Sequence, residues 1–406
     1  MVADKPRISG KEENMVRPVV TLVALLVLIG FTAFGCSKTD EGSTTSRPGG
    51  SSSAPAGAIK VRVGVIVPKT GDIATYGDMV EKAVRIAADD ARLEGKVAPE
   101  LIILDNGADQ QKTASSAKQL IDTDKVDVIV GPVTTKNSIM AGDIAEAARV
   151  PLVTPTATNV EVTRNRKYVF RVCFTDAFQG STAANFAYDT LGARRAAVLV
   201  DSSEPYSMGL GDEFSRIFKQ RGGEIASYVA FTAGGDDFGG QVTQMKMKAP
   251  DVVFMPTYYE PAAKCVSQAR AMGFRTTFVG TDGWDSSKLY ELSGGTVKGN
   301  YFTTHFSPLE ERPVVKMFVQ NFRAAYGVDP DALAALGYDA AMVVFDAVKR
   351  AGRADRQAIT DALATTTDFE GVTGKFSIDA NHNAVKSVVI LETGDSSSML
   401  KAIVAP

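Results

Sequence analysis

The feature that most constrains the fold is a regular alternation of two kinds of sequence from residue 59 onward. Short runs rich in β-branched residues are separated, in most cases, by amphipathic stretches such as 78–94 and 212–222. The runs that we expect to be strands are 60–68, 100–105, 126–131, 150–155, 195–201, 224–231, 251–257 and 276–281. Such alternation is most economically folded as a parallel sheet with helices on both faces. The sequence therefore predicts an α/β protein.

The expected strands fall into two groups, which is enough for two α/β lobes in a chain of 406 residues. The section after residue 306 differs, because three expected helices are followed by two short strand-like runs. No second linker precedes this section, so we expect it to pack back onto both lobes and to make the chain cross between them several times. The fold class predicted is two doubly wound parallel-sheet lobes joined by a multi-crossover hinge. Their expected boundaries are 59–176 plus 307–385 for the N-terminal lobe and 177–306 plus 386–406 for the C-terminal lobe.

The segment before residue 59 has the order of an export signal. Residues 18–35 carry no charge, follow Arg17 and lead into Cys36, after which the chain becomes polar. This order is typical of a secretory signal peptide, although a stretch of this length could also just span a bilayer as a permanent helix. The letters AFGC resemble the lipobox of bacterial lipoproteins, with Ala33 where Leu is more usual. We expect a lipoprotein signal peptide at 1–35, with Met15 as the true start.

The next segment is expected to be a flexible tether. Residues 36–58 are rich in Ser, Thr, Gly and Pro and have too little apolar surface to fold. The folded part would then lie outside the cytoplasmic membrane, in the periplasm or at the cell surface, held there by lipid on Cys36.

Composition excludes several classes of function. A formal net charge of −3 without a block of Lys and Arg argues against nucleic acid as a partner. The two histidines, His305 and His382, have no metal-ligand or triad spacing, so we expect both to be structural or surface residues and expect no metal or cofactor. Cys173 and Cys265 could form one disulfide, but we expect two isolated thiols.

Polar and aromatic side chains follow the expected strands at their carboxyl ends, where open α/β sheets bind ligands. Thr154, Thr156 and Thr158 alternate after the fourth strand and would share one face if the strand geometry continued. Thr135 precedes a helical stretch, whose free N–H groups favour an anion, and Asp282 could face a cation. The aromatic residues expected to enclose the remainder are Tyr76, Tyr206, Tyr258 and Trp284.

Each of these residues also has an ordinary structural interpretation. Thr135 could be a helix N-cap, Asp282 a turn residue, the tyrosines half-buried packing, and the threonines a solvated strand end. Their common place at strand ends favours a pocket for a small zwitterion. An exported enzyme is the alternative, but the inventory contains no pair of nucleophile and base, and one carboxylate is a poor catalyst alone.

From about residue 59 to residue 392 the chain resembles the leucine/isoleucine/valine-binding protein family, the type I periplasmic binding proteins of branched-chain amino acid ABC transporters. The stretches that carry the resemblance are VGVIVPKTGDIATYGD, VIVGPVTTKNS, VPLVTPTATNVEVT, FRVCFTDAFQG and FVGTDGW. They occur in family order and spacing. The resemblance implies capture of an amino acid between two closing lobes and its delivery to the permease subunits of a transporter. A non-amino-acid ligand, or a sensor role in the same fold, is the alternative.

The resemblance also implies roles for individual residues. Thr135 would bind the ligand α-carboxylate through its hydroxyl and N–H, while the carbonyl of Thr156 and the hydroxyl of Thr158 would bind the ammonium group together with Asp282. The complete expected ligand-binding set is Tyr76, Thr134, Thr135, Thr156, Ala157, Thr158, Tyr206, Tyr258, Asp282 and Trp284.

This chain departs from the family pattern at three places. Many members have a disulfide between cysteines at the positions of Ala108 and Thr134, and both cysteines are absent here. Asp282 stands where the family has an acidic residue that is often Glu, one methylene longer. Trp284 adds bulk, which would narrow the side-chain pocket or stack on an aromatic ligand. These departures leave the ligand less defined than the fold.

Overall fold

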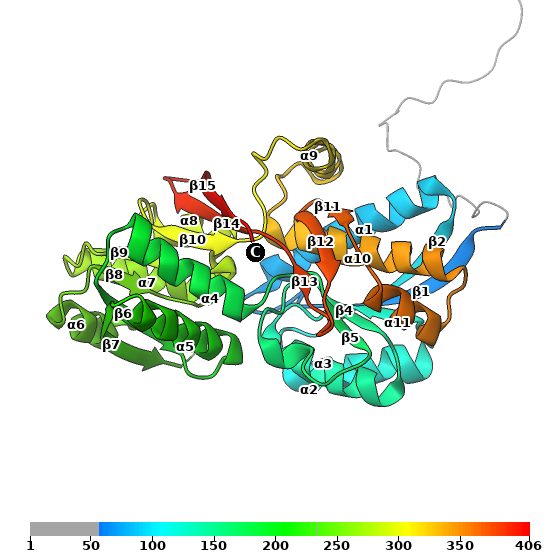
Figure 1. Ribbon diagram of the computed structural model, residues 1–406, viewed down its shortest axis with the longest axis horizontal. Helices are drawn as coiled ribbons and strands as arrows, with labels where there is room; N and C mark the ends of the chain where they lie inside the picture. Colours follow the sequence, from blue (N-terminus) through cyan, green and yellow to red (C-terminus); the bar gives the residue numbers. More distant parts are fainter. Residues whose placement is uncertain (1–56, 233) are drawn as a thin grey trace, which may run out of the picture. The chain divides into compact units, whose positions relative to one another are not determined.

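The computed structural model describes residues 57–232 and 234–406, which belong to one compact unit. The expected signal peptide at 1–35, the lipidation at Cys36 and nearly all of the tether at 36–58 lie outside the described residues. Two large sheets with covering helices make up most of the described part (Figure 1). We call them the first sheet and the second sheet.

The first sheet has the strand order β2-β1-β3-β4-β5, and all of its strand pairs are parallel. Its strands are β1 (Ile59–Val67), β2 (Val97–Asp105), β3 (Val128–Val130), β4 (Leu152–Thr154) and β5 (Val169–Arg171). The helices that follow β1, β2 and β3 are α1 (Ala74–Glu94), α2 (Gln110–Lys118) and α3 (Thr135–Ala148), with short helical turns at Gln119–Thr123 and Val160–Val162.

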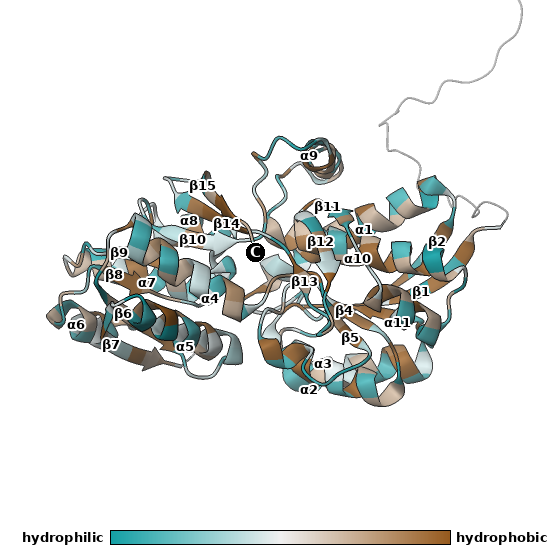
Figure 2. Ribbon diagram, in the orientation of Figure 1, coloured by the Kyte–Doolittle hydropathy of each residue, from teal (hydrophilic) through white to brown (hydrophobic). Residues whose placement is uncertain are grey.

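Alternation along β1 explains how this sheet is covered on both faces. Val63, Val65 and Val67 are fully buried in the cluster that contains α1, whereas Ile66 belongs to the cluster formed with α2 and α3. Strands that are buried on both faces are apolar throughout, which is why these segments stand out in the sequence and in Figure 2.

The second sheet has the order β15-β14-β10-β9-β8-β6-β7. Its strands are β6 (Arg195–Asp201), β7 (Glu224–Phe231), β8 (Val252–Phe254), β9 (Thr277–Gly280), β10 (Tyr301–Thr304), β14 (Val388–Thr393) and β15 (Ser398–Val404). Its helices are α4 (Asp176–Asn185), α5 (Pro205–Gln220), α6 (Gly239–Met247), α7 (Tyr259–Ala271) and α8 (Ser287–Ser293), with short turns at Phe186–Thr190 and Asp282–Trp284. Helices α4 and α5 pack on one face, and α6 and α7 pack on the other.

The last section of the chain contributes to both sheets. Helix α10 (Ala332–Ala351) packs along α1 against the first sheet, with α9 (Pro313–Tyr326) and α11 (Arg356–Ala364) beside it. The small sheet β11 (Phe369–Gly371), β12 (Gly374–Ile378) and β13 (Ala384–Val385) follows, and β14 then joins the second sheet. The chain therefore passes between the two sheet systems three times, through residues 172–175, 305–312 and 386–387.

Five strands were not expected from the sequence, namely β5, β10 and β15 and, in the small sheet, β11 and β13, which have three and two residues. The first two are only three and four residues long, and the residues of β15 are half-buried or exposed, so none presents a long apolar run. The second sheet is also not parallel throughout. Strand β14 pairs antiparallel with β10, and β15 pairs antiparallel with β14, because the chain enters this edge from the opposite end.

The three connecting segments pack against one another through their aromatic and basic side chains. The His305 ring stacks on Phe174 with centroids 3.6 Å apart; beside these segments, the His382 ring, in the loop before β13, stacks on Phe170 of β5 at 4.1 Å. The buried amino group of Lys386 donates to the carbonyl of Val172 at 3.0 Å. All three segments are thus held at one place, which we call the hinge.

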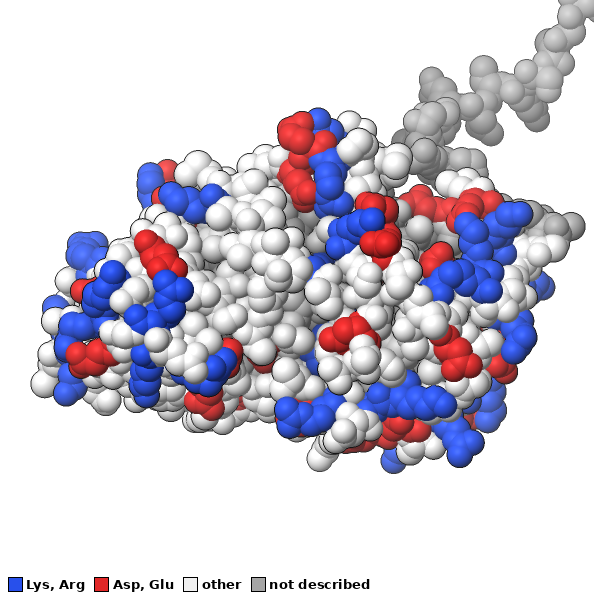
Figure 3. Space-filling view, viewed as in Figure 1, with Lys and Arg blue, Asp and Glu red and all other residues white. Residues whose placement is uncertain are grey.

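Charge and hydropathy of the described residues agree with the composition. On the face shown in Figure 3, Lys and Arg side chains are interspersed with Asp and Glu. Within residues 57–232 and 234–406, none of the helices combines the length and apolar character needed to cross a bilayer. The same ranges hold no group of three or more His, Cys, Asp or Glu side chains placed to bind a metal ion.

Candidate functional site

Segments that follow the strands of both sheets meet around one small cavity. Seven of the ten expected ligand-binding residues line it, namely Tyr76, Thr134, Thr135, Thr156, Tyr206, Tyr258 and Asp282. Val133, Gly283 and Leu333 complete the lining. Ala157 and Thr158 follow Thr156 in the same loop and are buried, but they do not line the cavity.

The N-terminus of α3 forms one side of the cavity. Thr134 is the N-cap residue and Thr135 is the first helical residue, so the interpretation of Thr135 as an N-cap is wrong by one position. The hydroxyl of Thr134 accepts a hydrogen bond from Asn137 at 2.9 Å and does not cap the backbone. The hydroxyl of Thr135 is buried without a hydrogen-bond partner. The free N–H groups of this first turn and the Thr135 hydroxyl can therefore bind an anion.

The threonines after β4 do not form the expected row on one face, because the strand ends at Thr154. The hydroxyl of Thr154 donates to the carbonyl of Pro132 at 2.7 Å, and that of Thr156 donates to the carbonyl of Val133 at 2.5 Å. Both hydroxyls therefore fasten this loop to the loop before α3. The Thr158 hydroxyl differs, since it is buried without a partner.

A fully buried arginine supports this loop from behind. Arg171 donates to the carbonyl of Ala157 and to the carbonyl of Asn159, both at 2.7 Å. Arg171 is fully excluded from solvent, and this burial lowers its pKa. The sequence interpretation missed Arg171 as a supporting residue, although it lies in the quoted stretch FRVCFTDAFQG.

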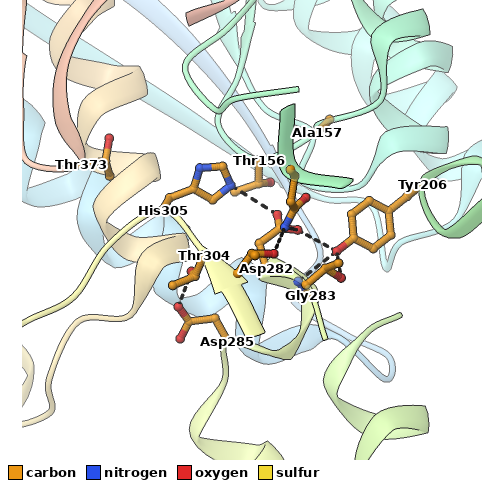
Figure 4. A network of polar contacts seen from close by, with 12 residues as sticks. Thr156, Ala157, Tyr206, Asp282, Gly283, Asp285, Thr304, His305 and Thr373 are labelled. Atoms are coloured by element: carbon orange, nitrogen blue, oxygen red, sulfur yellow. Dashed lines mark hydrogen bonds and ion pairs between the residues drawn. The ribbon is translucent and has the colours of Figure 1, made fainter. Parts of the chain in front are cut away.

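Asp282 lies on the opposite side of the cavity, in the short turn after β9 (Figure 4). One carboxylate oxygen accepts hydrogen bonds from Gln179 at 2.8 Å and from Tyr206 at 2.6 Å. The other oxygen lies 3.3 Å from Nε2 of His305. The carboxylate is held by neutral side chains, so its negative charge is available to a cation in the cavity.

The three tyrosines form an aromatic wall. The rings of Tyr206 and Tyr258 are stacked with centroids 5.5 Å apart, and Tyr76 meets Tyr258 edge-on at 5.9 Å. Burial raises the pKa of all three hydroxyls well above the ordinary value, so they stay neutral. Tyr76 donates its hydroxyl to the main-chain carbonyl of Gly283, which joins α1 on the first sheet to the turn on the second.

Trp284 does not enclose the cavity, and this expectation is wrong. The side chain is fully buried in the core, and its Nε1 donates to the carbonyl of Met255 at 3.1 Å. The indole packs over Gly280, where an added Cβ would lie 2.2 Å from the ring. The same tight turn thus places Asp282 at the cavity and Trp284 against the sheet.

Two further groups near the site were not singled out from the sequence. Asp176, the first residue of α4, is buried without a hydrogen-bond partner, and burial raises its pKa to about 8. His305 was expected to be a structural or surface residue, yet it contacts Asp282. Cys173 and Cys265 are both buried and unbonded, as expected.

Contacts outside the cavity also join the two sheet systems. Lys136 in the first turn of α3 forms an ion pair of 2.6 Å with Glu204, the N-cap residue of α5. Asn159 donates to the carbonyl of Pro205 at 2.9 Å. The cavity is therefore bordered by direct contacts between segments of the first and second sheets.

These features suit a small molecule with separated charges, at the strand ends of two α/β halves. A family model described as periplasmic binding protein matches residues 60–397, and the chain belongs to that family. The resemblance and the fold class drawn from the sequence are confirmed.

Individual relatives cover most of the chain. The leucine binding protein LivK from Thermotoga maritima is 39% identical with a TM-score of 0.82, over 85% of this chain and 99% of that protein. The branched-chain amino acid transporter substrate binding protein LivJ from Streptococcus pneumoniae, solved with isoleucine, is 33% identical with a TM-score of 0.81, over 86% of this chain and 100% of that protein. The leucine-, isoleucine-, valine-, threonine- and alanine-binding protein of Pseudomonas aeruginosa is 28% identical over 77% of this chain and 84% of its own length.

Proposed function

We propose that this protein is the solute-binding component of an ABC transporter and that its ligand is an amino acid, aliphatic or branched-chain in its side chain. The observation that carries the proposal is the pairing of two oppositely charged subsites across one cavity. The uncapped first turn of α3 with Thr135 suits a carboxylate, and Asp282 suits an ammonium group.

The remaining groups fit an amino-acid head group and an apolar side chain. In this arrangement the main-chain carbonyl of Thr156 accepts from the ammonium group, and Leu333, Val133 and the tyrosines surround the side chain. The names of the relatives support this ligand class, because they bind leucine, isoleucine or valine. Binding rather than catalysis is proposed, since the lining offers hydroxyls, rings and one carboxylate.

Transport would follow from closure of the two halves. The ligand contacts are divided between segments of the first and second sheets, so a ligand stabilises the closed arrangement by its preference for it. A permease would recognise the closed form. We retain the two lobes as proposed, 59–176 plus 307–385 and 177–306 plus 386–406, and we propose that lipid on Cys36 holds the protein at the membrane.

The test is calorimetric titration of residues 57–406, unfolded and refolded to remove bound ligand, against the amino acids and then against amides and aromatic acids. Several aliphatic L-amino acids are expected to bind, and Thr135→Ala and Asp282→Ala are each expected to weaken binding by roughly 2 to 4 kcal/mol, because each leaves a ligand charge unpaired. Binding by a ligand without an ammonium group, and by no amino acid, would contradict the proposal.

A further inference from the structure

His305 lies where the hinge meets the proposed ammonium subsite. It directly follows β10, in the second segment that connects the two sheet systems. One face of its ring stacks on Phe174, which belongs to the first connecting segment. Its Nε2 lies 3.3 Å from the Asp282 oxygen that is not occupied by Gln179 and Tyr206. The residue therefore contacts the hinge as well as the carboxylate, and Figure 4 shows its contact with Asp282.

The surroundings of His305 define its tautomer. A carboxylate can only accept a hydrogen bond, so Nε2 carries the hydrogen and donates to Asp282. Nδ1 is buried without a hydrogen-bond partner. The charged groups that face the ring are Asp282 and Lys386, and burial lowers the pKa of His305 to about 4. At neutral pH the ring is thus a neutral donor, and the contact leaves the charge of Asp282 uncompensated.

We propose that His305 is a positioning residue for ligand binding, which holds Asp282 toward the ammonium group while neutral and competes with that group when protonated. This inference rests on the proposed function. In acid, Nδ1 takes up a proton from solvent and the contact becomes an imidazolium–carboxylate ion pair. The ligand ammonium then loses part of the charge that binds it, so acid promotes ligand release.

Two substitutions separate the donor from the stacked ring. His305→Phe keeps an aromatic ring against Phe174 and removes the donor, whereas His305→Gln can place an N–H near the position of Nε2 and cannot titrate. The control is His382→Asn, since His382 stacks on Phe170 away from the cavity and Asn tolerates its left-handed backbone, with φ 62°. Affinity is measured by calorimetry from pH 4 to pH 8 with an amino acid that binds the wild type.

We expect His305→Phe to weaken binding at pH 7 by about tenfold, the loss of one hydrogen bond to a charged group. His305→Gln is expected to restore most of that loss. The ratio of wild-type to His305→Gln dissociation constants is expected to be constant from pH 6 to 8 and to rise below pH 5. This ratio cancels the effects of pH that both proteins share. Unchanged affinity in His305→Phe, or a ratio that does not vary with pH, would overturn the proposal.

A measurement without ligand tests the role of His305 independently of the proposed function. The chain contains two histidines, so the His382→Asn variant shows the ring nitrogens of His305 alone in NMR spectra. We expect an Nε2–H tautomer that titrates well below pH 6. An Nδ1–H tautomer, or titration near the ordinary value of about 6.5, refutes the positioning role whether or not an amino acid binds. Failure of every amino acid to bind the wild type, with the expected tautomer present, refutes the proposed function instead.

Discussion

Lys136 and Glu204 form an ion pair of 2.6 Å that joins the first turn of α3 to the N-cap of α5. The side chain of Glu204 is 6% exposed and that of Lys136 is 30% exposed, so the pair is shielded from solvent on one side. Lys136 directly follows Thr135, and Glu204 lies two residues before Tyr206; both Thr135 and Tyr206 line the cavity. The two sheet systems are therefore linked immediately next to the site by a contact that involves no ligand atom.

This link is expected to stabilise the closed arrangement. Lys136→Met should weaken ligand binding more than Glu204→Gln, because it leaves a buried carboxylate unpaired, whereas Glu204→Gln leaves only a half-exposed ammonium. We expect Lys136→Met to lose about 1 to 3 kcal/mol of binding free energy and Glu204→Gln to lose about 1 kcal/mol, mainly through faster dissociation of the ligand. Surface plasmon resonance with immobilised protein checks this. Equal dissociation rates in both variants and the wild type would show that closure does not depend on the pair.

Arg171 should be needed both for folding and for the shape of the ammonium subsite. Arg171→Met removes donors from the carbonyls of Ala157 and Asn159, which remain buried, and we expect the free energy of unfolding to fall by about 3 kcal/mol. Arg171→Lys can satisfy one of the two carbonyls and should lose less. Urea denaturation measures the stability, and calorimetry measures the affinity of the folded fraction. A fully stable Arg171→Met variant would contradict the role of Arg171 in folding.

Lys386 should make stability depend on pH in the alkaline range. Burial lowers its pKa from 10.5 to about 8. Below pH 8 the amino group is protonated in both states, and between about pH 8 and 10.5 the unfolded chain binds more protons, so stability rises with pH there. The difference between the two pKa values corresponds to a change of about 3 kcal/mol in the free energy of unfolding. The stability gap between wild type and Lys386→Met, measured by urea denaturation at several pH values, should therefore shift in favour of the wild type as the pH rises. A gap that is independent of pH would exclude this titration.

Trp284 should contribute to stability and not to ligand selectivity. Trp284→Phe leaves a cavity in the core and removes the hydrogen bond to Met255, so we expect a loss of about 2 to 4 kcal/mol in unfolding free energy. Affinity for the ligand should stay within about twofold of the wild type, since the ring does not line the cavity. Thermal unfolding and calorimetry separate the two effects. A change in ligand preference in this variant would show that Trp284 contributes to the binding site.

Strands β6, β8 and β9 were predicted correctly because they are almost fully buried and continuous apolar runs mark them. Strand β15 was missed for the opposite reason, since it lies at a sheet edge and carries exposed Met399, Leu400 and Ile403. The three helices of the last section were recognisable from their periodicity. Their attachment to the first sheet could be anticipated only from the lack of a second linker.

The site was predictable where a residue follows a strand end within a few positions, as with Thr135 and Asp282. The predictions that failed are those for residues whose orientation depends on the course of the backbone. An early end of β4 turned Thr154 and Thr156 toward neighbouring carbonyls, and a tight turn buried Trp284. The contact of His305 with Asp282 joins residues from different strands, so no local pattern in the sequence reveals it.

The three passages between the sheet systems also impose an order on the synthesis of the protein. Strand β1 emerges early, but helix α10, which covers the face of Val63 and Val65, is made only after most of the second sheet. Strands β14 and β15, which complete the second sheet, come from the last residues of the chain. Neither half can finish its core while the C-terminal section is still being translated. The nascent chain must therefore remain incompletely folded until strands β14 and β15 have been made.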